Sequence, residues 1–324
     1  MERPAILTEG LVKNFGIVRA LDGVDLAVPH GTVLGLLGPN GAGKTTAVRI
    51  LTTILRPDGG HAEILGVDVT ADPETVRSSI GLAGQYAAVD ENLTGRENLR
   101  LMGKLTHQPR PVIAPRADEL LERFGLHAAA DRPVRTYSGG MRRRLDLAAA
   151  LVHRPPVLFL DEPTTGLDPR GRLDLWAVIE ELVADGATLL LTTQYLEEAD
   201  RLADRIAVVD HGNVVAEGTA GELKAQLGST IVHVDLAPGT DIDAAKSVLG
   251  EVGAVDIADD RQSIEVKVTE KGSALLDVVR RLDGAGLPPA GLSVREPSLD
   301  DVFLTLTGHA AGDGDDQDDK EDDR

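Results

Sequence analysis

Cysteine is absent from this sequence of 324 residues. A chain without thiols has no disulfides, no thiolate metal ligands and no cysteine nucleophile, which fits a reducing compartment such as the cytoplasm. Aromatic residues are also scarce, at 2% of the chain, whereas hydrophobic residues as a whole make up 42%. The core must therefore be packed from Leu, Val, Ile and Ala, and the composition indicates a folded protein with an aliphatic interior.

Long apolar runs are missing as well. No run approaches the roughly 18 residues that a helix needs to span a bilayer. The N-terminal sequence MERPAILTEG lacks the charged and then apolar pattern of a signal peptide. We therefore expect a chain that is soluble by itself. Its length exceeds that of most single cores, which predicts two domains and a tail.

Positive charge is in short supply, because 33 Lys and Arg residues face 53 Asp and Glu residues, for a net charge of −20. This balance argues against a nucleic-acid-binding surface, since affinity for phosphate backbones comes mainly from clustered Lys and Arg. The acidic stretch GDGDDQDDKEDDR, which begins at Gly312, has no apolar residues to bury. We predict a disordered tail over residues 309–324, with a contact tail for a basic partner as the alternative.

Short β-branched or leucine-rich runs alternate with helical patterns from Ile6 to about Gly218, which predicts an α/β fold with a mostly parallel sheet. Between Gln85 and Gly125 the pattern becomes helical and is broken by the Pro-rich HQPRPVIAP, which predicts a helical insert. Continuous apolar runs of the kind found in strands buried on both faces occur at 33–38, 157–161, 188–193 and 205–210.

A second pattern begins after GELKAQLGS. Strand-like TIVHVDL, helical DIDAAKSVLGEVG, strand-like segments around AVDIADD and SIEVKV, helical SALLDVVRRLDGAG and strand-like LSVRE follow in turn. The order βαββαβ predicts a small α+β domain of ferredoxin-like topology that ends in the short helix LDDVFLTLTG. We place the first domain at 1–225, with its helical subdomain at about 86–145, and the second domain at 226–308.

The segment GPNGAGKTT, from Gly38 to Thr46, has the pattern G-x-x-x-x-G-K-[ST] of a P-loop and lies between the strand-like VLGLL and the helical AVRILTTIL. Its glycines let backbone N–H groups approach phosphate oxygens, and Lys44 adds a positive charge for the β- and γ-phosphates. Thr45 is the expected Mg2+ ligand. An accidental Gly-rich turn would not explain the flanking strand and helix. The predicted phosphate-binding residues are Gly38, Pro39, Asn40, Gly41, Ala42, Gly43, Lys44, Thr45 and Thr46.

The run VLFLDEP ends a buried strand in two adjacent carboxylates, Asp161 and Glu162, whose side chains must point in different directions. We therefore expect different tasks. Asp161 would hold Mg2+, and Glu162 would act as the general base on an attacking water. The alternative is a solvated charge pair at the end of a strand.

Together with the P-loop, the segment TYSGGMRRRLDLAAALVHRPPVLFLDEPTTGLDPRGR resembles the nucleotide-binding domains of ABC transporters over residues 5–225. The resemblance implies an ATPase whose mostly parallel sheet carries an antiparallel β subdomain and a helical subdomain. Ser138, Gly139 and Gly140 match the family signature LSGGQ, with Tyr137 and Met141 at its two ends. In the family this segment covers the γ-phosphate bound by a second copy, so that two ATP molecules lie in a head-to-tail dimer. A simple helix cap would explain Ser138 but not the whole segment.

Four further residues take their expected roles from this resemblance. Gln85 matches the Q-loop glutamine, which contacts Mg2+ and water and lies where the membrane partner docks. Asp168 matches the D-loop aspartate, and Phe15 matches the aromatic residue that stacks on adenine, although a core phenylalanine is the alternative. Gln194 stands where the family has its switch histidine. A glutamine amide can donate a hydrogen bond to the γ-phosphate but carries no charge, so we expect slow hydrolysis.

Within the family, TTQYLEEADRLADRIAVVDHG and PSLDDVFLTLTGH resemble the ATP-binding subunits of daunorubicin and doxorubicin resistance exporters. The resemblance implies an ATPase that drives efflux of a drug-like or lipid-like compound through a separate membrane permease. Such a subunit is peripheral and lies on the cytoplasmic side of the cell membrane.

Two other functions are compatible with the motifs. The first is a soluble ABC protein of translation or DNA repair, which the single P-loop, the absence of zinc-binding cysteines and the negative charge disfavour. The second is an ATP-gated regulatory subunit without turnover, which Gln194 makes worth testing. The second domain would contribute to dimer contacts or regulation, or would only stabilise the chain.

Overall fold

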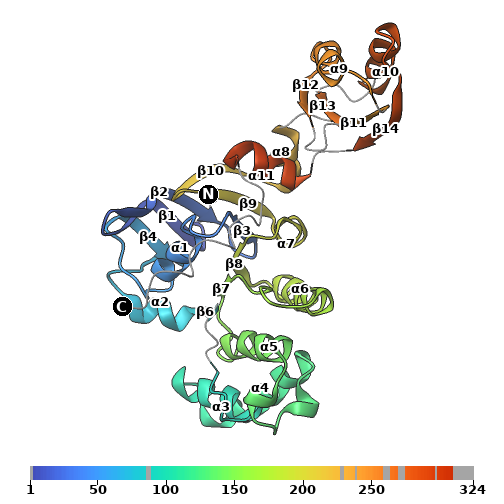
Figure 1. Ribbon diagram of the computed structural model, residues 1–324. Helices are drawn as coiled ribbons and strands as arrows, with labels where there is room; N and C mark the ends of the chain where they lie inside the picture. Colours follow the sequence, from blue (N-terminus) through green and yellow to red (C-terminus); the bar gives the residue numbers. More distant parts are fainter. Residues whose placement is uncertain are drawn as a thin grey trace, which may run out of the picture. The chain divides into compact units, whose positions relative to one another are not determined.

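The computed structural model describes residues 3–84, 89–226, 230–237, 239–257, 263–268, 274–295 and 298–308. By its contacts the chain divides into two compact units (Figure 1). The first covers the residues up to Glu217, and the second begins at Gly218. The predicted tail, 309–324, lies outside the described residues.

A six-stranded sheet with the strand order β10-β9-β3-β8-β7-β6 forms the centre of the first unit. Pairing is parallel from β9 through β3, β8 and β7 to β6, which confirms the predicted α/β fold. The four apolar runs selected from the sequence are all strands of this sheet. The strands are β3 (Val33–Leu37), β6 (Ile80–Ala83), β7 (Val157–Asp161), β8 (Thr188–Thr193), β9 (Arg205–Asp210) and β10 (Asn213–Gly218).

Both faces of this sheet are covered, which explains why its strands read as continuous apolar runs. Leu158 and Leu160 of β7 belong to one buried cluster, whereas Val157 and Phe159 belong to the cluster on the opposite face. Figure 1 shows helices α5 (Gly139–Ala150), α6 (Pro169–Ala184) and α7 (Leu196–Leu202) on one face. The other face carries α1 (Lys44–Leu51) and α2 (Pro73–Ser79).

An antiparallel sheet with the order β2-β1-β4-β5 packs on the α1 side of the first unit. Its strands are β1 (Ile6–Phe15), β2 (Val18–Val28), β4 (Gly59–Ile64) and β5 (Val67–Asp68). This sheet corresponds to the antiparallel β subdomain that the family resemblance implied. The tight β1–β2 turn holds Phe15 at its rim, with 47% of the residue exposed. Phe15 is therefore not a core residue, so that alternative is wrong.

Helices α3 (Gly95–Leu105) and α4 (Arg110–Arg123) occupy the region where the sequence predicted a helical insert. A capping box fixes the start of α3, with Thr94 and Glu97 each bonding the other's backbone N–H. The Pro-rich segment does not only break the pattern, because α4 contains both Pro111 and Pro115. Pro111 is tolerated in the first turn, where its missing N–H would have no intrahelical acceptor. Two short 3-10 helices follow, η1 (His127–Ala129) and η2 (Val134–Thr136).

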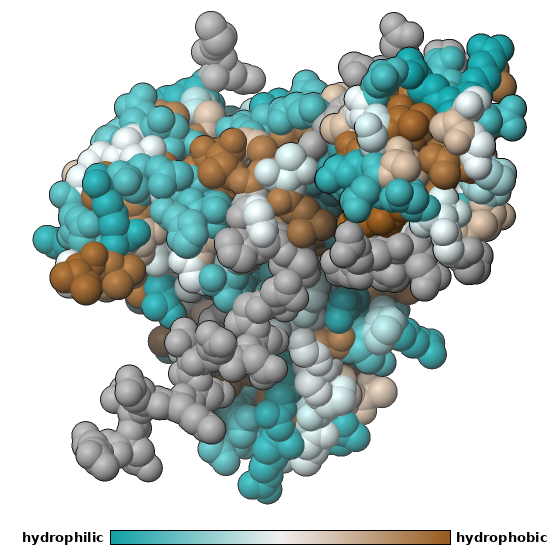
Figure 2. All heavy atoms as spheres, turned by 45° about the horizontal axis from the view of Figure 1, so that its top comes forward, coloured by the Kyte–Doolittle hydropathy of each residue, from teal (hydrophilic) through white to brown (hydrophobic). Residues whose placement is uncertain are grey.

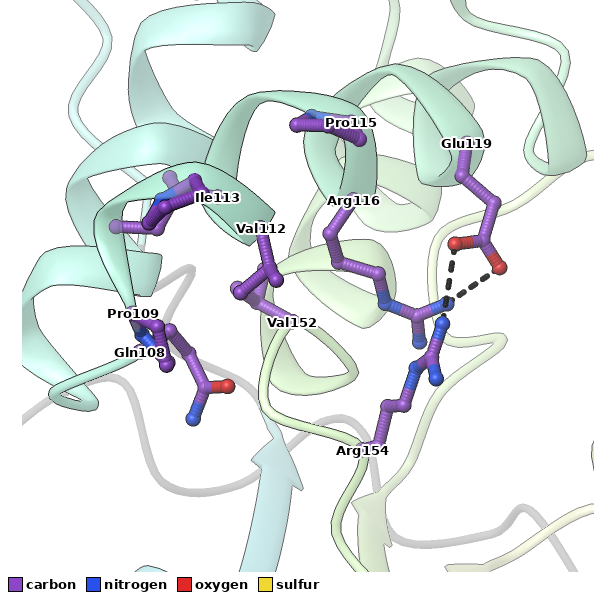
Figure 3. A pocket seen from close by; sticks show the side chains of 10 residues that line it. Gln108, Pro109, Val112, Ile113, Pro115, Arg116, Glu119, Val152 and Arg154 are labelled. Atoms are coloured by element: carbon purple, nitrogen blue, oxygen red, sulfur yellow. Dashed lines mark hydrogen bonds and ion pairs between the residues drawn. The ribbon is translucent and has the colours of Figure 1, made fainter.

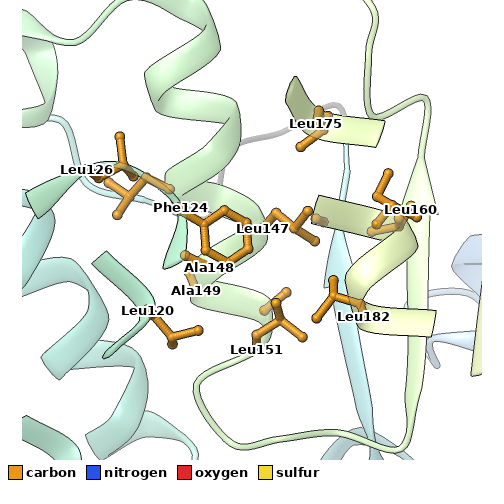
Figure 4. Close-up of a cluster of buried hydrophobic side chains, with 14 of the residues drawn as sticks. Leu120, Phe124, Leu126, Leu147, Ala148, Ala149, Leu151, Leu160, Leu175 and Leu182 are labelled. Atoms are coloured by element: carbon orange, nitrogen blue, oxygen red, sulfur yellow. The ribbon is translucent and has the colours of Figure 1, made fainter. Parts of the chain in front are cut away.

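A cluster of buried aliphatic side chains joins α4 and α5 to α6 and the central sheet (Figure 4). Phe124, which directly follows α4 and is 1% exposed, contributes an aromatic ring to this cluster. The single tryptophan of the chain, Trp176, belongs to the same cluster and is 2% exposed. Other members are Leu120, Leu126, Leu147, Leu151, Leu160, Leu175 and Leu182.

The second unit has the predicted βαββαβ order and an antiparallel sheet with the strand order β12-β13-β11-β14, as expected for a ferredoxin-like topology. Alternate residues of β11 and β13, such as Val232, Val234 and Val266, pack against α9 and α10. The elements are α8 (Ala220–Gln226), β11 (Thr230–Leu236), α9 (Ile242–Leu249), β12 (Ala254–Ile257), β13 (Ser263–Val268), α10 (Ala274–Gly284), β14 (Pro289–Arg295) and α11 (Leu299–Thr307).

Across the described residues, no helix combines the length and apolar character needed to cross a membrane. In Figure 2, hydrophilic residues cover much of the face shown, and the hydrophobic ones form small separate groups.

The cluster in Figure 4 predicts that Phe124→Ala will destabilise the first unit by about 3–5 kcal/mol, because a ring is removed from a fully packed site. Urea unfolding followed through Trp176 fluorescence measures this change directly, since Trp176 lies in the same cluster. Val112→Ala on α4 is the matched control, because Val112 is 47% exposed and its loss should change stability by less than about 0.5 kcal/mol. Equal midpoints for the two variants would contradict the assigned packing.

Candidate functional site

The P-loop connects the carboxyl end of β3 to the first turn of α1, as the sequence predicted. Gly41 and Gly43 have φ angles of 79° and 108°, which side-chain-bearing residues rarely adopt. A Cβ atom on Gly38 would lie 2.3 Å from the carbonyl oxygen of Val209, and one on Gly43 would lie 2.4 Å from that of Ala20. Glycine is therefore required at these positions by backbone conformation and by close packing. Without side chains there, the backbone N–H groups at the N-terminus of α1 can approach an anion closely.

Lys44 is buried, with 3% of its side chain exposed. Its Nζ donates hydrogen bonds to the carbonyl oxygens of Gly38 and Pro39, at 2.8 and 2.9 Å, and lies 3.7 Å from Oε1 of Glu162. Burial lowers the pKa of Lys44, and the carboxylates of Glu162 and Asp161 act in the opposite direction. The ammonium group is thus fixed inside the loop, facing the end of β7.

Asp161 and Glu162 point in different directions, as expected for successive residues at the end of β7. Oδ1 of Asp161 accepts hydrogen bonds from the hydroxyls of Thr45, at 3.1 Å, and Thr192, at 2.6 Å. The carboxylate of Glu162 instead lies near Lys44 and accepts a bond of 3.3 Å from Thr165 Oγ1. The two carboxylates are buried and hydrogen-bonded, which rules out a solvated charge pair.

The backbone of Glu162 is in a left-handed conformation, with φ of 49°. Such a conformation costs a side-chain-bearing residue roughly 1–3 kcal/mol and persists only where neighbours hold it in place. Part of the restraint comes from Thr192, whose hydroxyl and carbonyl oxygens lie 3.0 and 3.1 Å from the Glu162 nitrogen. Sequence reasoning missed Thr192. The available signal was the pair of threonines that ends the apolar run TLLLTT, and the structure shows that Thr192 is fully buried.

Ser138 caps α5, and its Oγ accepts a hydrogen bond of 3.3 Å from the backbone N–H of Met141. The helix cap proposed as the simple alternative therefore exists. It does not explain the two glycines, however. A Cβ on Gly139 would meet nothing within 4 Å, and one on Gly140 would make only an ordinary contact of 3.8 Å with Leu167. The chain itself thus leaves open space beside this segment.

The remaining predicted residues lie outside this bonded group. Asp168 caps α6 through a hydrogen bond of 3.0 Å from the Gly171 N–H to its Oδ1. Gln194 directly follows β8 and is half-buried, and Phe15 is exposed at the β1–β2 turn, 5.6 Å from Lys13 Nζ. Gln85 lies outside the described residues. The structure thus brings Lys44, Thr45, Asp161 and Glu162 into contact. Among the described residues, no direct bond joins Phe15, Ser138, Asp168 or Gln194 to that group.

A cavity of about 370 Å³ lies between the start of α5 and the loop that follows β7. Gly139 lines it on the α5 side, and Glu162 and Thr165 line it on the strand side. Two α5 arginines, Arg142 and Arg143, also line it, together with Asp146, Gly166 and Leu167. Glu162 is therefore accessible from the side of the signature segment as well as facing Lys44.

A second cavity, of about 490 Å³, lies between the start of α4 and the loop that follows α5 (Figure 3). Its wall is mostly apolar, from residues such as Val112, Ile113 and Val152. At one side Arg116 and Arg154 both bond the carboxylate of Glu119, at 2.6 and 3.4 Å. None of the residues selected from the sequence lines this cavity, so it does not form part of the predicted nucleotide site.

Two protein families match the chain. The family described as ABC transporter matches residues 21–165, and that described as ATP-binding protein DrrA1-3-like, C-terminal domain, matches residues 218–307. The chain is 54% identical to the daunorubicin resistance ATP-binding protein DrrA3 of Streptomyces coeruleorubidus, over 95% of this chain and 97% of that protein. It is 51% identical to the daunorubicin/doxorubicin resistance ATP-binding protein DrrA of Streptomyces peucetius, over 95% and 94%. The Nod factor export ATP-binding protein I of Ralstonia nicotianae is 37% identical, over 94% of each chain.

Solved structures agree with these relatives. One is cbiO1 from Clostridium perfringens, part of the ABC transporter complex cbiONQ, with a TM-score of 0.64 and 28% identity over 69% of this chain and 92% of that one. Another is a dimeric post-hydrolysis state of the ATP-binding cassette MJ0796 bound to ADP and phosphate, with a TM-score of 0.61 and 26% identity over 66% and 98%. The resemblance stated from the motifs is confirmed. The chain belongs to the ATP-binding subunits of ABC transporters, in the group of the daunorubicin and doxorubicin resistance proteins.

Proposed function

We propose that this subunit binds and hydrolyses MgATP in a head-to-tail dimer and thereby drives export through a separate membrane permease. The observation that carries the proposal is the convergence of Lys44, Thr45, Asp161 and Glu162 where β3 and β7 end. It supplies a phosphate-binding cation, a pair of oxygens for a metal and a carboxylate for water within a single buried site.

Mg2+ fits the residues present. The Thr45 hydroxyl and the Asp161 carboxylate lie 3.1 Å apart, and no cluster of three or more metal-ligating acids, histidines or cysteines occurs among the described residues. This sparse protein contribution suits Mg2+, which is commonly held by one or two side chains together with waters and substrate phosphates. When bound, the ion would neutralise charge on the β- and γ-phosphate oxygens. Gln85 remains a predicted member of this group.

Glu162 is the proposed general base. Its carboxylate is oriented by Thr165 and by Lys44, and an oriented carboxylate can accept a proton from water. Gln194, placed after β8, would donate a neutral hydrogen bond to the terminal phosphate. Since its amide does not titrate, Gln194 is expected to slow turnover rather than to abolish it.

The second copy would contribute Ser138, Gly139 and Gly140. Backbone N–H groups at the start of a helix favour an anion, and the space beside Gly139 leaves room for a phosphate. The dimeric ADP-bound relative supports this assembly. Phe15 is exposed at the rim of the β1–β2 turn, as an aromatic platform for adenine must be, and stacking of this kind contributes about 1–3 kcal/mol per base.

The names of the relatives supply the proposed role. Those most similar here are drug resistance proteins for daunorubicin and doxorubicin, and a more distant one serves Nod factor export. We propose efflux of a drug-like or lipid-like compound, such as an anthracycline, with the subunit held on the cytoplasmic side of the cell membrane by its permease. A role in translation or repair is disfavoured by the net charge of −20. A regulatory subunit without turnover is disfavoured by the assembled Lys44 and Glu162.

Replacing Glu162 with Gln should lower the rate of phosphate release by about 10²- to 10⁴-fold, while MgATP still binds, because the amide cannot accept the proton of water. Turnover and nucleotide affinity measured on the same preparations test this directly. Glu180→Gln is the control, since that carboxylate is exposed and pairs with Arg201. Absence of turnover in the wild type, with MgATP bound, would instead favour the regulatory subunit.

The head-to-tail dimer predicts complementation between two inactive variants. Lys44→Ala should lose MgATP binding in its own P-loop, and Ser138→Arg should obstruct the partner's site. A mixed dimer of the two contains one intact site, formed by the Lys44 of one copy and the Ser138 of the other. ATPase activity should therefore reappear on mixing. Random pairing makes about half of the dimers mixed, and each mixed dimer has one of two sites, so the mixture should reach about a quarter of the wild-type value if both sites act equally. Mixtures that remain inactive, although dimers form, would argue against sites shared between copies.

The proposed partner predicts that a tagged subunit copurifies with a polytopic permease of the drug-export type. Coexpression of both should reduce cellular accumulation of an anthracycline, and Glu162→Gln should restore accumulation without breaking the complex. If ribosomes or DNA stimulated the ATPase and permease-containing membranes did not, the export role would be wrong.

A further inference from the structure

Arg143 projects from α5 toward the ends of two neighbouring strands, and only 14% of its side chain is exposed. Its Nε donates to the carbonyl oxygen of Pro163 at 2.7 Å. Its Nη2 donates to the carbonyl oxygens of Asp161 and Glu162, at 3.0 and 2.6 Å. The Nη1 group donates to the carbonyl oxygen of Gly84. One guanidinium thus bonds four backbone carbonyls, nearly all that its five N–H donors allow.

The charge of this guanidinium is balanced inside the protein. Asp146, one turn further along α5, is 1% exposed and lies 3.9 Å from Arg143 Nη1. Burial lowers the pKa of Arg143, and the Asp146 carboxylate acts against this shift. Arginine keeps its proton in such surroundings because its intrinsic pKa is very high. The cation is therefore a permanent part of the interior.

The four carbonyls lie where the sheet ends. β6 and β7 are parallel neighbours with Ala83 opposite Leu160, and Gly84, Glu162 and Pro163 come directly after these strands. Buried carbonyl groups beyond the ladder need other donors. A planar guanidinium can bond several of them at once, whereas a lysine ammonium is a point charge on a flexible stem.

One of these carbonyls belongs to Glu162, whose backbone is in the left-handed region, with φ of 49°. The direction of its carboxylate depends on this unusual conformation. Thr192 holds the nitrogen side of Glu162, and Arg143 holds the carbonyl side together with the next carbonyl, of Pro163. The Glu162 carbonyl also accepts a longer hydrogen bond of 3.3 Å from the Thr165 N–H. Loss of Arg143 would leave this carbonyl with that one bond, and the Pro163 carbonyl would lose its bond to the Arg143 guanidinium.

We propose that Arg143 is a positioning residue for hydrolysis. It fixes the backbone of Glu162 and connects this residue to Ser138, which caps the helix α5 that carries Arg143. This inference rests on the proposed ATPase function. A shift of α5 on engagement of Ser138 with the second copy's nucleotide would reach Glu162 through a single side chain that bonds four carbonyls. The same side chain holds Gly84, the residue before Gln85.

The test compares Arg143→Gln and Arg143→Lys with the control Arg142→Gln. Arg142 is the neighbouring arginine of α5, but it pairs with the exposed Glu91 and bonds the carbonyl of Arg135. For Arg143→Gln we expect kcat to fall by about 10- to 100-fold, as for a catalytic group that is misplaced by about 1 Å. The Kd for MgATP should stay within about twofold, because Arg143 does not contact the P-loop. Arg143→Lys should recover part of the rate, and the control should match the wild type.

Hydrogen exchange provides a readout that does not depend on turnover. In Arg143→Gln, the amides of Glu162 and of residues 164–167 should exchange about tenfold faster than in Arg142→Gln, with β3 unchanged. Equal kcat values for Arg143→Gln and the control would overturn the proposal, as would a parallel loss of kcat, MgATP affinity and β3 protection. If Arg143→Gln does not fold, wild-type kcat and exchange in Arg143→Lys would overturn it. If the wild type lacks turnover, hydrolysis is refuted, and the exchange data alone decide whether Arg143 holds this peptide.

Discussion

The hydrogen bonds at the carboxyl end of β7 are the interaction on which the rest of the site depends. Thr192 of β8 bonds both the carboxylate of Asp161 and the backbone nitrogen of Glu162, because parallel pairing places Asp161 opposite Thr192. The P-loop follows β3, which is the other neighbour of β8. Parallel strands have their carboxyl ends at the same edge of the sheet. Parallel pairing alone therefore brings residues that are far apart in the sequence together at this edge. Sheet register therefore decides which hydroxyl meets which carboxylate.

Much of this arrangement could be predicted from the sequence, since each signal was local. β7 was predicted from the apolar run VLFL. The residues DEP that continue this run placed two carboxylates at the end of the strand. The P-loop glycines were predicted from their spacing, and the structure gives their reasons: Gly38 and Gly43 have no room for a Cβ, and Gly41 has a positive φ angle. The βαββαβ order of the second unit was likewise encoded in successive short patterns.

The features that the sequence did not predict depend on tertiary contacts. Nothing in the run MRRRL distinguishes Arg143 from Arg142 and Arg144, because helix orientation decides which of them reaches the sheet. The left-handed backbone of Glu162 has no signature either, since that conformation is usually marked by Gly or Asn. The Pro-rich HQPRPVIAP was correctly predicted to break the helical pattern, but the sequence analysis did not show that the same segment also begins α4. It combines a break between two helices with the first turn of α4, where proline is favoured.

The two halves of the proposed site differ in how completely this chain builds them. Lys44 and Asp161 are buried and bonded within the chain, so the proposed phosphate and metal positions are formed without a second copy. Ser138 caps its own helix and otherwise adjoins open space at Gly139. Under this proposal, the Lys44 half can hold nucleotide in the isolated subunit. The Ser138 half contributes only when it faces the nucleotide bound by a second copy. Arg143 connects the two halves, because it belongs to α5, which Ser138 begins, and bonds the carbonyls of Asp161 and Glu162. In our proposal, one side chain therefore links dimer contact to hydrolysis.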